Sequence, residues 1–240
     1  MWIKNNVVPK KDADNLKRQM RQIKLWHNHT NAEEGIAQAI RTNPGILTEK
    51  LPGIFSNTLV AEYFINKGNE KINRAIIDAA PEILNKYYSD FGQEYEQEDF
   101  GGLSQKKHNI GYLIAIKNTQ LITYMLEKNA ELAEDNNFIK FAIEFGSEGT
   151  IKYIIENFTS KIFEIDTQSN RLFANQIIDI TESMNIVSSI ENKLKIFMDR
   201  LPADSDIGQQ FNRLEKQISK FKREYLKRFE KNEMNKKPEL

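Results

Sequence analysis

Cysteine is absent from this sequence, and several other residue types are scarce. Without cysteine the chain can form no disulfide, no thiolate zinc site and no cysteine nucleophile, so its stability must come from packing. Its 240 residues suffice for one large domain or two small ones with a substantial core. The lack of cysteine fits a reducing compartment, and we expect a cytoplasmic protein.

Proline and glycine are also few, with six and eleven residues respectively. Valine and threonine are sparse, whereas isoleucine, leucine, lysine, glutamate and asparagine are abundant. This composition favours helices joined by short turns. We therefore predict an all-α fold.

Neither a long apolar run nor a net charge is present. No run approaches the roughly 20 apolar residues of a membrane-spanning helix, and residues 1–26 lack the apolar core of a secretory signal. We expect a soluble protein with no transmembrane segment. Because 34 basic residues balance 34 acidic ones, no global field attracts nucleic acid, and we expect no nucleic-acid partner.

A pattern of two apolar stretches around a polar turn occurs four times within residues 12–160. Apolar residues within each stretch recur three or four positions apart, which predicts a pair of helices. The second stretches of three copies are similar: INRAIIDAAPEIL from Ile72, LITYMLEKNAELA from Leu121 and TIKYIIENFTSKI from Thr150. Pro44 and Pro81 stand at equivalent places in the first two copies. The repetition predicts a short α-solenoid, and chance similarity among amphipathic helices is the alternative.

Two of these copies resemble degenerate ankyrin repeats. They are NIGYLIAIKNTQLITYMLEKNAEL, from Asn109 to Leu132, and NFIKFAIEFGSEGTIKYIIENF, from Asn137 to Phe158. The two helices and the turn between them match that family in kind, but every copy lacks its Thr-Pro-Leu-His opening and its Asp-Gly hairpin tip. The resemblance implies an ankyrin-like helix-turn-helix solenoid that binds a protein partner, with hairpin fingers shortened or replaced by loops.

The parts outside the repeat have their own character. Residues 1–11 are expected to form a flexible arm, and residues 85–108 form an insertion between the second and third copies. From residue 161 the repeat fades. There we predict two helices with heptad-spaced apolar residues that pack as a C-terminal antiparallel hairpin over residues 161–231, the first starting near Gln168 or Asn170. Such a hairpin would cover the last repeat, and residues 232–240 are expected to be a disordered tail.

The insertion contains an acidic segment, residues 89–102, with three aromatic residues: Phe91, Tyr95 and Phe100. Exposed aromatic side chains ringed by charge are typical of a binding hot spot. The alternative is that the aromatic residues fold back and seal the solenoid. The ankyrin resemblance places further partner-binding residues on the first helices, at Tyr63, Asn66 and Tyr112.

No catalytic, cofactor or metal motif stands out. His27 and His29 alternate, but zinc needs three or four ligands, so a polar turn is favoured. Asp90-Phe91-Gly92 matches a kinase motif in letters alone, because the glycine-rich and catalytic loops are missing. We therefore predict a non-enzymatic protein-interaction module without cofactor or metal. The alternative is an enzyme or modifying factor with a site where the solenoid meets the C-terminal helices.

The last predicted helix, residues 208–231, is rich in lysine and arginine. A basic amphipathic helix can bind an anionic membrane surface or an acidic partner. Internal packing with a solvated basic face is favoured, because the preceding helix has a matching apolar seam. The composition and the tail RFEKNEMNKKPEL resemble effectors that intracellular bacteria deliver into host cells. That resemblance implies translocation into a host cell and action on a host protein.

Overall fold

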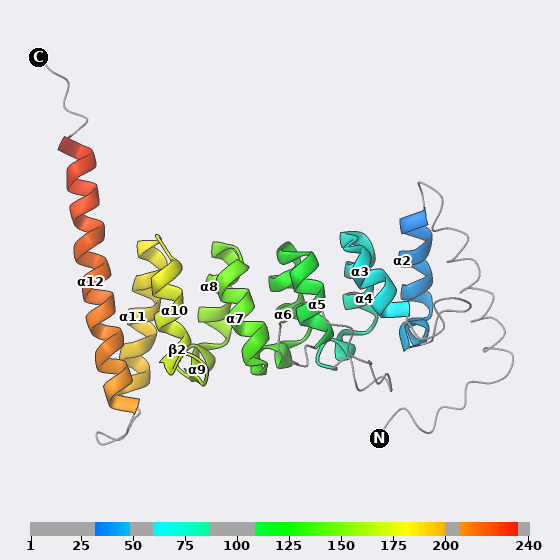
Figure 1. Ribbon diagram of the computed structural model, residues 1–240, viewed down its shortest axis with the longest axis horizontal. Coiled ribbons are helices and arrows are strands. Elements are labelled where there is room, and N and C mark those ends of the chain that lie inside the picture. Colours follow the sequence, from blue (N-terminus) through cyan, green and yellow to red (C-terminus); the bar gives the residue numbers. More distant parts are fainter. Residues whose placement is uncertain (1–31, 49–59, 87–108, 200–206, 235–240) are drawn as a thin grey trace, which may run out of the picture. The chain divides into compact units, whose positions relative to one another are not determined.

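The computed structural model describes residues 32–48, 60–86, 109–199 and 207–234. These residues are mostly helical, with 11 α-helices and one two-stranded sheet (Figure 1). The all-α fold class is thereby confirmed at this coarse level. The chain divides into two compact units, Met1–Leu132 and Ala133–Leu240.

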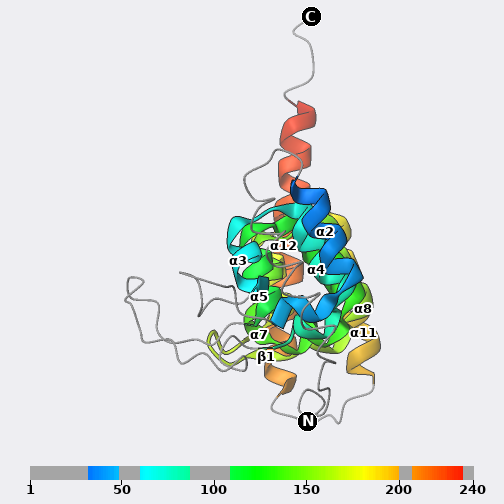
Figure 2. The same ribbon diagram turned by 90° about the vertical axis from the view of Figure 1, so that its right-hand side faces the viewer.

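The first unit contains helices that pack in neighbouring pairs. Its elements are α2 (Ala32–Thr42), the 3-10 helix η1 (Pro44–Thr48), α3 (Val60–Lys67), α4 (Glu70–Ala79), η3 (Pro81–Ile83), α5 (Ile110–Lys117), η5 (Thr119–Leu121) and α6 (Ile122–Lys128), and η6 (Ala130–Glu134) begins at its end. Helix α2 packs against α4, α3 against α4 and α5, and α4 against α6. Figure 2 shows α3 and α5 on one side of this unit and α2 and α4 on the other.

Local chemistry explains the tight turn between α3 and α4. Gly68 has a φ of 66°, in the left-handed region that a residue without Cβ adopts most easily. Asn69 then caps α4, because its side-chain oxygen accepts a hydrogen bond from the N–H of Ile72 at 3.0 Å. Pro81 starts the next short helix directly after α4 ends. A polar turn thus separates the two helices, as the pattern of apolar stretches predicted.

The second unit adds a small hairpin and a long last helix. Its elements are α7 (Asn136–Phe145), α8 (Glu148–Asn157), α9 (Thr159–Ile162), β1 (Ile165–Asp166), β2 (Arg171–Leu172), α10 (Phe173–Ile180), α11 (Met184–Met198) and α12 (Ile207–Met234). Helix α7 packs against α8 and α10, and α8 packs against α11. Helix α12 contacts both α10 and α11, so its partners are two helices where the sequence predicted one.

Two kinds of contact hold α12 in place. The rings of Phe163, Phe197 and Phe211 form a cluster with centroids 5.0 to 5.9 Å apart. The side-chain amides of Asn175 in α10 and Gln217 in α12 form a hydrogen bond at 2.6 Å, and Gln217 also donates to the backbone oxygen of Asn175 at 3.1 Å. The long helix is thus anchored by both apolar and polar groups.

The segment after residue 161 differs from its prediction. A helix was expected from Gln168 or Asn170, but β1 and β2 pair antiparallel there and α10 begins at Phe173. Asn170 allows the tight connection, because asparagine tolerates the left-handed region and its φ is 52°. Its N–H also donates to the oxygen of Asp166 at 2.8 Å. A backbone hairpin therefore precedes the helices.

A short helical turn follows each of α2, α4, α6 and α8. In every case two adjacent apolar residues of this turn, or directly after it, are buried: Ile46 and Leu47, Ile83 and Leu84, Leu132 and Ala133, and Ile162 and Phe163. The equivalent placement of Pro44 and Pro81 is borne out by η1 and η3, which both begin with proline. The expected arm (1–11), most of the insertion and residues 235–240 lie outside the described residues, whereas residues 232–234 belong to α12.

Candidate functional site

The two ends of the insertion meet at the start of α5. The N–H of Ile110 donates a hydrogen bond to the oxygen of Lys86 at 3.0 Å. Residues 87–108 lie outside the described part of the chain, but their flanking residues are fixed side by side. The insertion therefore leaves and rejoins the first unit at one place, which tethers it beside the first turn of α5.

Two further contacts fix that first turn. Asn109 caps α5, because its side-chain oxygen accepts from the N–H of Tyr112 at 2.7 Å. The N–H of Gly111 donates to the oxygen of Leu84 at 2.9 Å. A Cβ on Gly111 would lie 2.6 Å from the Cδ2 of Leu132 and 3.4 Å from the oxygen of Leu84. The absence of a side chain at Gly111 thus allows the first turn of α5, which includes Tyr112, to approach Leu84 and Leu132 closely.

Two of the predicted partner-binding residues lie on adjacent helices of the first unit. Tyr63 in α3 and Tyr112 in α5 are each half-buried, and α3 packs against α5. The Nζ of Lys67 lies 5.4 Å from the centroid of the Tyr63 ring, within the range of a cation–π contact. Burial raises the pKa of the Tyr63 phenol.

One more exposed apolar residue extends this surface. Ile116 follows Tyr112 by one helical turn and is 45% exposed. Asn66 belongs to α3, but its side chain is outside the described part, as are Phe91, Tyr95 and Phe100. We call Tyr63, Tyr112 and Ile116 the α3–α5 surface. The predicted sites in the insertion stay predictions.

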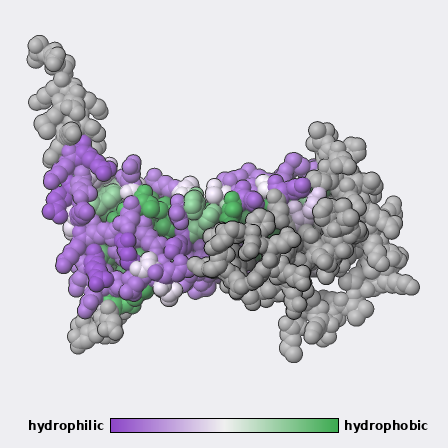
Figure 3. Space-filling view, viewed as in Figure 1, coloured by the Kyte–Doolittle hydropathy of each residue, from purple (hydrophilic) through white to green (hydrophobic). Residues whose placement is uncertain are grey.

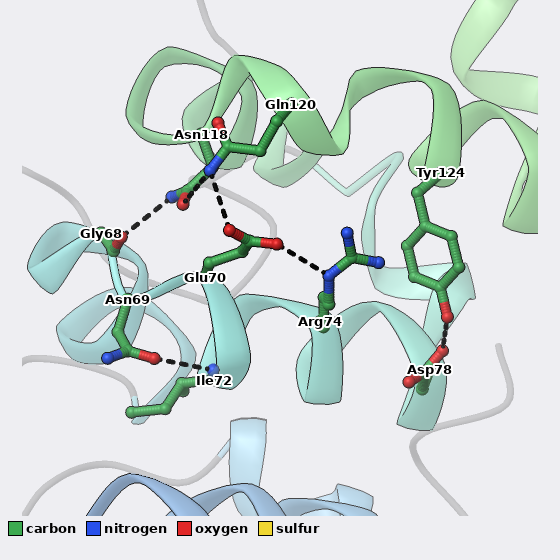
Figure 4. A network of polar contacts seen from close by, with 9 residues as sticks. All are labelled: Gly68, Asn69, Glu70, Ile72, Arg74, Asp78, Asn118, Gln120 and Tyr124. Carbon is green, nitrogen blue, oxygen red and sulfur yellow. Dashed lines mark hydrogen bonds and ion pairs between the residues drawn. The ribbon is translucent and has the colours of Figure 1, made fainter.

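A polar network joins α4 to the segment that starts α6 (Figure 4). Glu70 accepts from the Nε of Arg74 at 3.0 Å and from the Nε2 of Gln120 at 3.2 Å. The hydrogen bond from Arg74 and then that from Gln120 lower the pKa of the Glu70 carboxyl. Glu70 is therefore a stable carboxylate that ties two helix pairs together.

The same network continues at both ends of α4. The Nδ2 of Asn118, which is buried, donates to the oxygen of Gly68 at 3.1 Å. At the other end the Tyr124 hydroxyl forms a hydrogen bond with the Asp78 carboxylate, which raises the pKa of Tyr124 together with burial. These charged and polar groups satisfy one another. The α4–α6 face is therefore a structural contact.

Asp166 organises the hairpin of the second unit. Its carboxylate accepts from the Nζ of Lys140 at 3.4 Å and from the Nε2 of Gln176 at 3.0 Å. Burial alone would raise the pKa of Asp166, but hydrogen bonds from Ser169 and from the N–H of Gln168, with the charge of Lys140, lower it overall. This buried carboxylate is fully partnered, so it serves the fold.

Two hollows of the second unit flank the turn between α10 and α11. One, of about 300 Å³, lies between the end of α10 and α12 and is lined by Phe221, Tyr225 and charged residues such as Arg228. The other, of about 510 Å³, is wide open and is lined by Glu148 and Glu182, among others. The wider hollow, which residues of α8 also line, lies where the sequence placed the alternative enzyme site.

Glu148 of the wider hollow is held by neighbouring side chains. Glu148 accepts from the Oγ of Ser183 at 3.1 Å and pairs with the Nζ of Lys152 at 2.8 Å. Hydrogen bonds from Lys152 and then Ser183 lower the pKa of Glu148. A general acid or base works best with a pKa near the working pH, and Glu148 is shifted the other way.

Metal and membrane sites can be assessed for the described residues alone. Among them, no three histidine, aspartate or glutamate side chains gather in a way that could hold a metal ion. His27, His29 and His108 lie outside this part of the chain. No helix within the described ranges is long and apolar enough to cross a bilayer.

Sequence reasoning placed Tyr63 and Tyr112 on first helices, and both lie there. It missed the closure of the insertion at Lys86 and Ile110. Asn109, an N-cap residue directly before an apolar stretch, was the one local signal of where α5 starts. No protein-family model, curated protein or solved structure matches this chain.

Proposed function

We propose that this chain is a non-enzymatic protein-interaction module built on a divergent ankyrin-like stack of helix pairs. The recurrent short turn with two buried apolar residues, found after α2, α4, α6 and α8, supports a repeated architecture. In this proposal α11 and α12 form the antiparallel C-terminal hairpin. Its role is to cover an apolar helix face that would otherwise be exposed.

The partner, a protein, docks on the α3–α5 surface and on the tethered insertion. The observation that carries this is the hydrogen bond between the backbones of Lys86 and Ile110. It brings together the two residues that flank the acidic segment with three aromatic residues, at the first turn of α5, to which Tyr112 belongs. Aromatic residues that bury large areas within a charged rim are the usual anchors of protein interfaces.

Affinity purification with three versions of the intact protein tests this proposal. The first is unchanged, and the second carries Phe91→Ala, Tyr95→Ala and Phe100→Ala. The control carries Phe145→Ala, Ile180→Ala and Leu226→Ala, three apolar side chains that are exposed in the second unit. We expect a specific partner to be lost from the second version and retained by the control, because truncating hot-spot residues costs about 2 kcal/mol or more each.

A photo-crosslinking amino acid at Tyr112 provides an independent measurement. It should capture the same partner, whereas the same group at Lys195, an exposed residue of α11, should not. Equal recovery by all three versions, with no crosslink at Tyr112, would remove both the loop and the α3–α5 surface from the proposal.

The host-cell setting rests on resemblance in composition and tail. In this proposal the module is a secreted bacterial effector acting on a host protein. A translocation reporter fused to the chain with and without residues 232–240 tests it. No reporter signal in host cells from either version would contradict delivery.

A further inference from the structure

The outward face of α12 carries a straight row of positive charge. Five basic residues recur three and four positions apart, which places them on one side of the helix: Arg213, Lys216, Lys220, Arg223 and Lys227. They span fourteen positions, about 21 Å at the helical rise. We call this set the α12 basic row.

The row lies opposite the side that holds α12 to the protein. Phe211, Leu214 and Ile218 of α12 are buried, and they lie on the side that meets α10 and α11. All five members of the row are exposed. Figure 3 shows the described part of α12 as almost wholly hydrophilic on the face in view. The row is thus a solvent-facing surface.

The basic row also lacks partners within the protein. Lys220 has a distant ion pair with Glu224, at 3.9 Å, and the other four form no ion pair with any residue whose side chain the structure describes, which in α12 means residues 207–228. Elsewhere in the described chain, cations such as Arg74, Lys152 and Arg171 pair with carboxylates at 2.7 to 3.0 Å. The row is therefore a concentration of charge that the fold does not use.

We propose that the α12 basic row binds the surface of an anionic lipid bilayer. The helix lies along the membrane plane, so that all five cations meet the headgroups together. Leu226 is the one large apolar side chain that is strongly exposed among residues 207–228, the part of α12 whose side chains are described. Attachment is therefore electrostatic and reversible by salt.

Magnitudes favour a membrane over an acidic protein. A typical exposed ion pair contributes about twofold in affinity, so five pairs would give about thirtyfold. A lysine or arginine near an anionic bilayer contributes about fivefold, so five give about a thousandfold or more. A flat charged surface also meets a straight row along its full length.

Nucleic acid fits the row less well. Proteins that bind single strands place aromatic side chains beside their cations for base stacking, whereas Lys220 is the one member of the row that lines the hollow toward α10 together with Phe221 and Tyr225. Nucleic acid is therefore an outcome for the test to exclude.

Vesicle co-sedimentation of the full chain tests the proposal. The vesicles contain phosphatidylcholine alone or with about 30% phosphatidylserine, at about 0.05 and 0.15 M salt. We expect binding to the anionic vesicles alone, with marked weakening at the higher salt. The variant Lys216→Gln, Lys220→Gln and Arg223→Gln should bind about 100-fold more weakly, since three cations are lost.

The control variant is Lys117→Gln, Lys152→Gln and Lys195→Gln, which removes the same charge from exposed positions on α5, α8 and α11. It should bind nearly as the unchanged protein does, and Lys216→Arg with Lys220→Arg should bind fully. Glutamine is a good helix former, and circular dichroism checks that α12 persists. No binding to anionic vesicles, an equal loss in the control, or tighter binding to duplex or single-stranded DNA than to vesicles would overturn the proposal.

Discussion

Helices α4 and α12 both carry many charges but use them in opposite ways. In α4, Glu70 and Arg74 pair with each other, and Glu70 also accepts from Gln120 of the next helix pair. Helix α12 is held by its buried face, and four of the five members of its basic row have no ion pair with a side chain that the structure describes. Charge in α4 therefore belongs to the architecture. In α12, Lys222 pairs with Glu191 of α11 at 2.5 Å, whereas the charge of the α12 basic row is available to a partner.

This difference separates the charges that stabilise the fold from the charges that can bind a partner, which the composition alone does not distinguish. A chain with equal numbers of acidic and basic residues looks electrostatically featureless, yet its charges are not evenly matched in space. Changes on α4 should affect the stability of the fold, and changes on the outward face of α12 should affect binding. Three predictions test which residues of and beside these helices contribute to stability.

The largest expected effect is on the buried side of α12. Replacement of Phe211 by Ala removes a fully buried ring that contacts Phe163 and Phe197. Truncation of a core phenylalanine costs about 3–5 kcal/mol of the free energy of unfolding. Urea denaturation followed by circular dichroism measures it. A loss below about 1 kcal/mol would mean that α12 is not held by its apolar face.

A smaller loss is expected where α4 is tied to its neighbour. Asn118→Ala leaves the oxygen of Gly68 without its side-chain donor. The cost of an unpaired, partly buried acceptor is about 1–2 kcal/mol. Thr119→Ala, at an exposed neighbouring position, is the matched control for denaturation. Equal stabilities of the two variants would show that the hydrogen bond from Asn118 to Gly68 does not stabilise the first unit.

The smallest effect concerns the exposed carboxylate of Glu70 and depends on pH. Its pKa is lowered in the folded protein, so its contribution to stability is present above the ordinary glutamate pKa of about 4.3 and is lost as the pH falls through the folded value. Glu70→Gln should lower the melting temperature slightly at pH 7 and not at strongly acidic pH. A variant less stable by the same amount at both pH values would argue against the ionic contribution.

The parts of the fold that sequence predicted are those specified locally. The helices around Gly68 and around Gly146 follow from apolar spacing, and caps at Asn69 and Ser147 lie within three residues of the N–H groups that they accept from. Such signals sit within a short stretch of chain. The positions of these helices and of the turns between them could therefore be predicted from the sequence.

What sequence did not predict depends on distant contacts. The strands β1 and β2 are two residues long each, too short for a period-two pattern. Their turn depends on Asn170, and Asp166 is held by Lys140, which lies in α7. The same holds for the candidate site. Tyr63 and Tyr112 could be placed on helices, but no local pattern shows that Lys86 meets Ile110.

Asn73 of α4 has a practical consequence. Its side chain is fully buried, and neither its oxygen nor its nitrogen has a hydrogen-bond partner among the described residues. A buried unsatisfied amide costs about 1–3 kcal/mol, so an apolar residue of similar volume, such as leucine, should stabilise the first unit. Asn73 belongs to neither the α3–α5 surface nor the α12 basic row. The stabilised variant with leucine at this position could serve as the parent protein for further mutations. Destabilising substitutions at either surface could then be studied in a protein that still folds.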